Sequence, residues 1–277
     1  MLDNTYERDK FWQVLDQHVA WAKKHNVWII WNLFSTPQDQ ESSGWRCNNL
    51  ASQEGPLGDF WVEMANRYKN EPAVAGYDII NKPGWCSGWD YWFNMAERIA
   101  RRINAVAPNQ LVTISSTDGA TFPRKIQASN ILYQVHHYEP GLATHCGASA
   151  SAGSAGSYPG TMGNWGEGQV YWSRERMAAS AANNNHASLE YNIPVINWAK
   201  QNNVPLYVGE WGMQSEICVN GANDYVRDTG ELFIEKGLHH SYYVWKHGAT
   251  RWGNFCARAK FTNFAFHGTL QCRNCLV

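Results

Sequence analysis

The residues with the clearest chemical potential follow short apolar segments that resemble β-strands. Segment 72–80 leads into Asn81-Lys82-Pro83, and segment 204–209 leads into Glu210-Trp-Gly212. A carboxylate such as that of Glu210 can attack an electrophilic carbon or take up a proton, whereas Lys82 offers only an ammonium group. Because the carboxyl ends of parallel strands lie at one rim of a barrel, we expect both side chains at the same rim.

Helical and strand patterns alternate along the chain, and these elements must position the polar residues. The spacing of apolar residues predicts helices at 8–25, 58–70, 88–106, 188–202 and 223–236. Short branched and aromatic runs predict strands at 27–33, 74–80, 111–116, 131–136, 204–209 and 241–246. This alternation predicts an α/β fold with a parallel sheet and right-handed crossovers, either open or closed into a barrel. The Gly/Ala/Ser tract 147–157 reads as a flexible rim loop in the longest connection.

The composition is that of a globular protein, and we predict one domain over residues 1–277. Hydrophobic residues make up 44% and charged residues 17% of the chain, and the net charge is −1. Without runs of Lys or Arg there is no electrostatic reason to expect nucleic acid or an anionic membrane as partner. The 15 Trp, 13 Tyr and 10 Phe residues suit the apolar faces of pyranose sugars, although most such rings belong to a core. We expect a neutral ligand, no cofactor and no metal.

Seven cysteines favour an extracellular protein with disulfides. Cys47 and Cys86 follow consecutive predicted strands, as do Cys146 and Cys218, so we expect these two pairs to bridge neighbouring rim loops. The pair Cys272-x-x-Cys275 is a weaker signal for a metal than for a disulfide-bearing tail. Residues 1–5 lack the basic start and the apolar run of a secretory signal, so we expect any such segment to have been removed.

Three motifs together resemble glycoside hydrolase family five. Tyr77-Asp-Ile-Ile-Asn81-x-Pro83 resembles the fourth strand of that family, and Val208-Gly-Glu210-Trp-Gly212 resembles the seventh. His136-His-Tyr138-Glu-Pro140 resembles the His-x-Tyr-x-Pro of the sixth strand. The resemblance covers roughly residues 8–250, and it implies a (β/α)8 TIM barrel, here incomplete with about six recognisable strands.

The resemblance also implies a role for each matching residue. Glu210 takes the place of the nucleophile, and Lys82 takes the place of the catalytic acid and base. Asn81 would bind the sugar's 2-hydroxyl group, and His136 and Tyr138 would contact the substrate and the nucleophile. Trp245, in Tyr243-Val-Trp245-Lys246, would form a platform for the sugar before the cleaved bond.

The sequence departs from the family pattern at several points. A retaining glycosidase needs two carboxyl groups about 5–5.5 Å apart, and a lysine cannot readily replace one of them. Asn32 and Phe34 stand where the third-strand motif usually ends in Asp-x-His. Compared with the family, the first two strand-helix units are absent, and with them an arginine beside the nucleophile. A sequencing or cloning accident would explain Lys82 alone, but Asn32 and Phe34 would need separate explanations.

Three classes of function therefore remain open. The first is a degenerate hydrolase that binds a β-linked glucan and cleaves it slowly or not at all, and we favour it. The second is an active endoglucanase or mannanase in which another group supplies the acid. The third is an extracellular self-assembling protein, because a barrel that lacks strands exposes edges beside 27–33 and 241–246. We expect the tail 252–277, a partner subunit, or both, to cover that seam.

Overall fold

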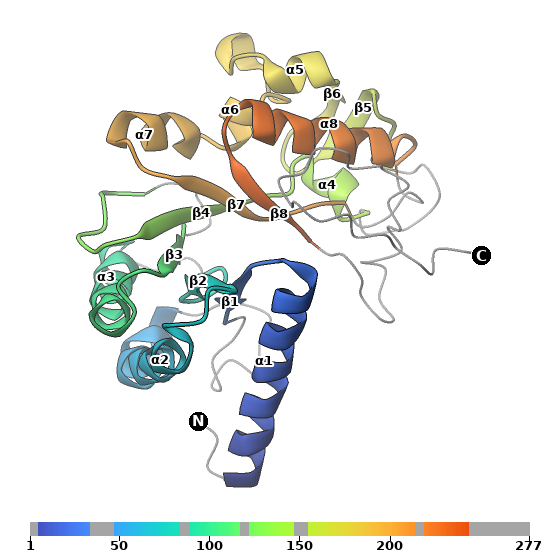
Figure 1. Ribbon diagram of the computed structural model, residues 1–277. Coiled ribbons are helices and arrows are strands. Elements are labelled where there is room, and N and C mark those ends of the chain that lie inside the picture. The colour runs from blue at the N-terminus through green and yellow to red at the C-terminus, as the bar shows by residue number, and fades with distance from the viewer. Residues whose placement is uncertain are drawn as a thin grey trace. The chain divides into compact units, whose positions relative to one another are not determined.

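A computed structural model describes residues 5–33, 47–83, 89–116, 122–146, 155–213 and 219–243 (Figure 1). Helices and strands alternate, as the sequence predicts. The main helices are α1 (Thr5–His25), α2 (Cys47–Tyr68), α3 (Trp89–Val106), α7 (Val195–Asn202) and α8 (Ala222–Glu235). The strands of the main sheet are β1 (Ile29–Asn32), β2 (Val74–Asp78), β3 (Leu111–Ser115), β4 (Ile131–His137), β7 (Leu206–Trp211) and β8 (His239–Tyr242).

All six predicted strands exist, and they follow one another in the sheet in chain order, β1-β2-β3-β4-β7-β8. The pairings of β1 with β2, β2 with β3 and β7 with β8 are parallel. The register places Asn32 opposite Asp78, and Asp78 opposite Thr113. Polar residues at the ends of neighbouring strands are thus brought together at one edge, as in any parallel sheet whose strands end in step.

The chain divides within β4, after Tyr133, into two compact units, and each is described by itself. The predicted single domain over 1–277 stays a prediction, and the tail 252–277 lies outside the described residues.

In the first unit, α2 and α3 run side by side next to β2 and β3 (Figure 1). Trp61 of α2 donates from Nε1 to the Ile79 carbonyl at 2.9 Å, and Trp92 of α3 donates to the Ser115 carbonyl at 3.0 Å, so these two rings, each at most 1% exposed, pack toward the ends of β2 and β3. Tyr77 of β2 closes this core and donates a hydrogen bond to Gln110 at 2.6 Å.

Helix α2 begins eleven residues before its predicted start at residue 58, which corrects the placement of Cys47 in a rim loop. Pro56 lacks the N–H that a helix interior uses, so a proline usually marks a helix boundary. The helix nevertheless continues through Pro56. Gly55 precedes the proline and has no Cβ to meet its ring, and Glu54 anchors this part of α2 to Arg98 of α3 by two hydrogen bonds of 2.6 and 2.8 Å.

In the second unit, the predicted helix 188–202 is in fact two helices. A short α6 (Leu189–Asn192) is separated from α7 by Ile193 and Pro194, because a proline cannot donate the backbone hydrogen bond that would join them. Figure 1 shows α7 and α8 on one side of β7 and β8. Strand β8 begins two residues before the predicted 241–246, and residues 244–246 lie outside the described part.

The long connection between β4 and β7 contains elements that the sequence analysis missed. They are α4 (Gly141–Thr144), β5 (Gly160–Asn164), β6 (Gly168–Trp172), α5 (Arg174–Ala178) and a 3-10 turn, η2 (Ala182–Asn184). Strands β5 and β6 form an antiparallel hairpin with a three-residue loop. Only residues 155–157 of the predicted flexible tract are described, and Gly156 forms a bridge with Met162. None of the described helices is both long and apolar enough to cross a membrane.

Candidate active site in the second unit

Glu210 lies near the carboxyl end of β7 and is only 9% exposed. A buried carboxylate needs hydrogen-bond or charge partners, because water no longer solvates it. Tyr138 provides one by donating its hydroxyl proton to Glu210 Oε1 at 2.7 Å. The His136 ring lies close to the other carboxylate oxygen, with Nδ1 3.7 Å from Glu210 Oε2. The structure therefore brings together three of the predicted site residues around one carboxylate.

The two partners reach Glu210 because of the pleat of β4 and the chain that follows it. His136 and Tyr138 are two residues apart, so both point to the same face, while His137 between them points to the other. His137 is 2% exposed and lies against Phe233 of α8. Burial and the Glu210 carboxylate raise the pKa of the Tyr138 phenol well above its usual value, so the hydroxyl stays protonated and acts as a donor.

The residue before Glu210 is a glycine, at a position with little room for a side chain. A Cβ on Gly209 would lie 2.2 Å from Oε1 of Gln134, whose side chain is buried on β4. Gln134 Nε2 in turn lies 3.4 Å from His136 Nε2. The glycine thus lets β4 and β7 approach closely, and this approach positions His136 beside the carboxylate.

In the first unit, Asn81 and Lys82 directly follow β2 and Ile79-Ile80. Asn81 is 3% exposed, and its backbone N–H donates to the Leu33 carbonyl at 2.9 Å. Lys82 is partly exposed and has a φ of 47°, a left-handed conformation that is uncommon for a lysine. Asn32 donates from Nδ2 to Asp78 Oδ2 at 2.5 Å. Asn32, which departs from the family pattern of the third strand, is thus a hydrogen-bond donor to a buried carboxylate. The sequence analysis did not single out Asp78, a polar residue at the end of its strand.

Several predicted site residues lie outside the described residues. They are Trp245, Phe34, Cys86 and Cys218. Cys146 is 2% exposed, and both predicted pairings, Cys47 with Cys86 and Cys146 with Cys218, stay predictions. In the described part of the chain, no group of three or more His, Cys, Asp or Glu side chains is arranged to hold a metal ion.

A row of rings next to Tyr138 was missed by the sequence analysis. The His145 ring centroid lies 5.1 Å from that of Tyr138, and the Trp165 ring lies 4.7 Å beyond His145. Trp165 belongs to the loop between β5 and β6. The available signal was the sequence Asn164-Trp-Gly-Glu-Gly168, whose two glycines have φ of 74° and 72° and allow the tight hairpin turn.

Several solved structures share this fold. A hyperthermophilic endo-beta-1,4-glucanase in complex with substrate matches with a TM-score of 0.65 and 20% identity, over 92% of this chain and 74% of the other. An endoglucanase from Thermotoga maritima matches with a TM-score of 0.65 and 17% identity, over 88% of this chain and 72% of the other. The cellulose synthase subunit Z from Clostridioides difficile matches with a TM-score of 0.63 and 17% identity, over 88% of this chain and 74% of the other. These likenesses confirm the predicted fold class, an α/β fold of the incomplete (β/α)8 barrel type.

The family follows from the sequence itself. The model of the cellulase family, glycosyl hydrolase family 5, matches residues 2–249, which is most of the chain. The chain therefore belongs to glycosyl hydrolase family 5.

Curated relatives match shorter stretches. An endoglucanase from Paenibacillus polymyxa is 24% identical over 157 residues, which are 48% of this chain and 39% of the relative. The major extracellular endoglucanase of Xanthomonas campestris pv. campestris is 32% identical over 153 residues, which are 46% and 31%. The matched part of this chain thus spans between 31% and 39% of the length of these relatives.

Proposed function

We propose that the protein recognises a β-linked glucan at Glu210 and that its hydrolytic activity is impaired or lost because Lys82 occupies the position of the catalytic acid and base. The observation that carries the proposal is the arrangement around Glu210, a buried carboxylate with a phenol at 2.7 Å and an imidazole at 3.7 Å. The curated relatives named above are endoglucanases, which supports a β-glucan as the ligand.

The Tyr138 hydroxyl and the His136 ring suit a nucleophile rather than an acid. A retaining glycosidase uses one carboxylate to form a bond to the anomeric carbon while the bond to the leaving oxygen breaks. The hydrogen bond from Tyr138 fixes the orientation of the Glu210 carboxylate, and such a donor interacts more strongly with a charged oxygen than with a neutral one. Glu210 is therefore held in the position that the first step needs.

The leaving oxygen still needs a proton, and the water of the second step needs a base. A carboxyl group supplies both in the family mechanism, as an acid first and then as its conjugate base. The side chain of Lys82 has no carboxyl group with which to fill these two roles. Loss of general acid–base help typically costs about 10²–10⁴ in rate. We therefore expect binding without efficient turnover.

The test compares four proteins for release of reducing ends from soluble β-glucan. They are the natural protein, Lys82→Glu, Lys82→Gln and Glu210→Gln. Residue 82 keeps a Cβ in all of them, so the left-handed backbone conformation at this position carries the same strain throughout. We expect activity to rise by at least tenfold in Lys82→Glu alone, because only this variant regains the second carboxyl group.

Binding of a β-1,4-linked glucan hexasaccharide by the same four proteins separates recognition from catalysis. We expect the natural protein and Glu210→Gln to bind it. Robust hydrolysis by the natural protein, abolished in Glu210→Gln, would replace this proposal by that of an active endoglucanase or mannanase. If neither the natural protein nor Lys82→Glu binds glucan or mannan, the proposal that the protein recognises a β-linked polysaccharide is refuted as well.

We also propose that the protein is extracellular. The seven cysteines, which are many for a reducing compartment, and the word extracellular in the name of the Xanthomonas relative support this location. Detection of the protein in the culture medium of its source, with cysteines joined in disulfides, tests the proposal. Retention inside intact cells with reduced cysteines would contradict it.

A further inference from the structure

A large apolar side chain stands exposed at the end of the β5–β6 hairpin. Trp165 is 53% exposed, although the strands beside it bury Met162 and Trp172 completely. Single exposed apolar residues are common on soluble proteins. The surroundings of Trp165 distinguish it from such residues, because the indole is held in place on one side and lies in a row of rings that leads to Glu210.

The backbone and the ring of Trp165 are both fixed. Asn164 is 4% exposed, and its Oδ1 accepts hydrogen bonds from the N–H groups of Gly141 at 2.7 Å and Trp165 at 3.0 Å. A Cβ on Gly141 would lie 2.3 Å from Cε3 of Trp165. The indole thus lies directly against the backbone of Gly141, at the start of α4, where a side chain would displace it.

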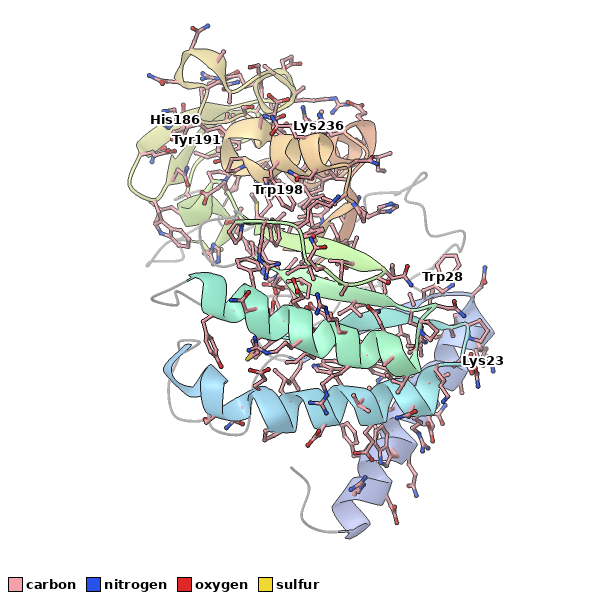
Figure 2. All side chains as sticks on the ribbon, turned by 90° about the vertical axis from the view of Figure 1, so that its left-hand side faces the viewer. Lys23, Trp28, His186, Tyr191, Trp198 and Lys236 are labelled. Atoms are coloured by element: carbon pink, nitrogen blue, oxygen red, sulfur yellow. The ribbon has the colours of Figure 1, made fainter. Side chains whose placement is uncertain are left out.

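The loop that carries Trp165 is anchored on its other side by Glu167. One carboxylate oxygen of Glu167 accepts from Asn164 Nδ2 at 2.7 Å. The other lies 2.7 Å from His186 Nδ1 and accepts from the Tyr191 hydroxyl at 3.1 Å. The rings of His186 and Tyr191 stack at 4.6 Å, and Figure 2 shows these two side chains next to each other. A ring held in this way loses little conformational entropy when a ligand binds to it.

The row of rings connects this indole to the candidate nucleophile. His145 lies between Trp165 and Tyr138, and its Nδ1 donates to the Gly141 carbonyl at 2.9 Å, which fixes the ring. The two ring separations are 4.7 and 5.1 Å, and the Tyr138 hydroxyl ends the row on Glu210. All of these residues belong to the second unit, so the row is part of one compact body.

From this arrangement we propose that Trp165 is a sugar-stacking platform that binds a further pyranose unit of the same β-linked glucan chain of which another, more distant unit lies at Glu210. The inference rests on the proposed function. A flat, partly exposed indole matches the apolar face of an equatorially substituted pyranose, while the ring's N–H edge can remain in contact with water. The platform has no charged group of its own, which fits a neutral polysaccharide.

The experiment measures binding of two β-1,4-linked ligands, the disaccharide cellobiose and the hexasaccharide, by isothermal titration calorimetry. We expect Trp165→Ala to bind the hexasaccharide about tenfold more weakly than the natural protein and to bind cellobiose unchanged, because only the longer chain spans Glu210 and the platform. Trp165→Phe should lose less affinity than Trp165→Ala, since it keeps a ring. Tyr171→Ala is the matched control, because Tyr171 is a 50% exposed aromatic residue on the same hairpin.

The outcomes separate this inference from the proposed function. If the natural protein binds neither ligand, the proposed function fails. If the natural protein binds the hexasaccharide and Trp165→Ala binds it equally well, only the platform is refuted. Equal losses in Trp165→Ala and Tyr171→Ala would also refute it, because the effect would then belong to the hairpin as a whole. Unchanged cellobiose binding in Trp165→Ala serves as the internal check that the variant is folded.

Discussion

The hydrogen bond between Tyr138 and Glu210 is the central contact of the site, and it can be measured without any assumption about catalysis. Tyr138→Phe removes the phenolic donor from a largely buried carboxylate at 2.7 Å. Hydrogen bonds to charged groups are worth about 1.5–3 kcal/mol, so we expect the free energy of unfolding in urea to fall by about that amount. Glu210→Gln and the double variant complete the cycle. Strictly additive effects of the two substitutions would show that the contact contributes nothing.

Gly209 provides a second prediction at the scale of a single residue. Gly209→Ala places a methyl group 2.2 Å from Gln134 Oε1, so we expect a loss of about 1–3 kcal/mol of stability from overpacking. Shortening the obstructing side chain should relieve the clash. Gly209→Ala should therefore cost less stability in a Gln134→Ser protein than in the natural protein. Chemical unfolding of the four proteins tests this. A fully tolerated Gly209→Ala would contradict the close approach of β4 and β7.

Sequence reasoning was successful for residues whose neighbours are set by the sheet. His136, Tyr138 and Glu210 end adjacent parallel strands, so their proximity follows from topology. His145 and Trp165 were missed because their contacts depend on a hairpin that folds back onto α4. Hydrophobic periodicity does not predict that a hairpin folds back onto a helix. The lack of room for a Cβ at Gly141 can be recognised only when the position of the Trp165 indole is known.

For the helices and strands, too, some sequence predictions were correct and others were wrong. All six predicted strands were found, since buried parallel strands are short apolar runs separated by amphipathic helices. The errors lie where a proline was misjudged, as at Pro56, which α2 tolerates, and at Pro194, which separates α6 from α7. The hairpin of β5 and β6 was missed because its strands contain glycines and few branched residues.

The long connection between β4 and β7 is anchored to α8 by a buried pair, and we expect this anchor to matter for stability. Tyr158 is 4% exposed and donates to Asp228 Oδ2 at 2.7 Å, while Arg227 binds the other carboxylate oxygen of Asp228 at 2.8 Å. Tyr158→Phe should cost about 1.5–3 kcal/mol in chemical unfolding, because it leaves one buried carboxylate oxygen without that donor. Tyr171→Phe, on the exposed hairpin surface, should cost almost nothing. Equal effects of the two substitutions would contradict the assignment.

For the whole molecule, the buried His137 and the half-buried His240 connect stability to pH. Burial lowers the pKa of His137 to about 4, and burial together with the charge of His239 lowers the pKa of His240 to about 4. His240 Nδ1 accepts a hydrogen bond from Trp211 Nε1 at 3.1 Å, so the folded state uses its neutral form. Neither ring nitrogen of His137 has a hydrogen-bond partner within the described part of the chain.

The direction of the pH dependence follows from these lowered values. In the unfolded chain a histidine binds its proton below about pH 6.5, whereas His137 and His240 stay neutral in the folded protein down to about pH 4. Between these limits the unfolded state holds more protons, so the free energy of unfolding falls as the pH falls, by up to about 1.4 kcal/mol per pH unit and histidine. Above about pH 6.5 the two histidines contribute no slope.

His137→Leu should therefore flatten the stability curve between about pH 6.5 and 4. Leucine fills a similar space against Phe233, cannot take up a proton in either state and removes two buried ring nitrogens that lack partners. We expect its stability relative to the natural protein to improve steadily as the pH falls through this window, as measured by urea unfolding at a series of pH values. Tyr171→Phe, on the exposed surface of the β5–β6 hairpin, is the control and should follow the natural curve. Parallel curves for His137→Leu and the natural protein would show that His137 is charged, or accessible to water, in the folded state.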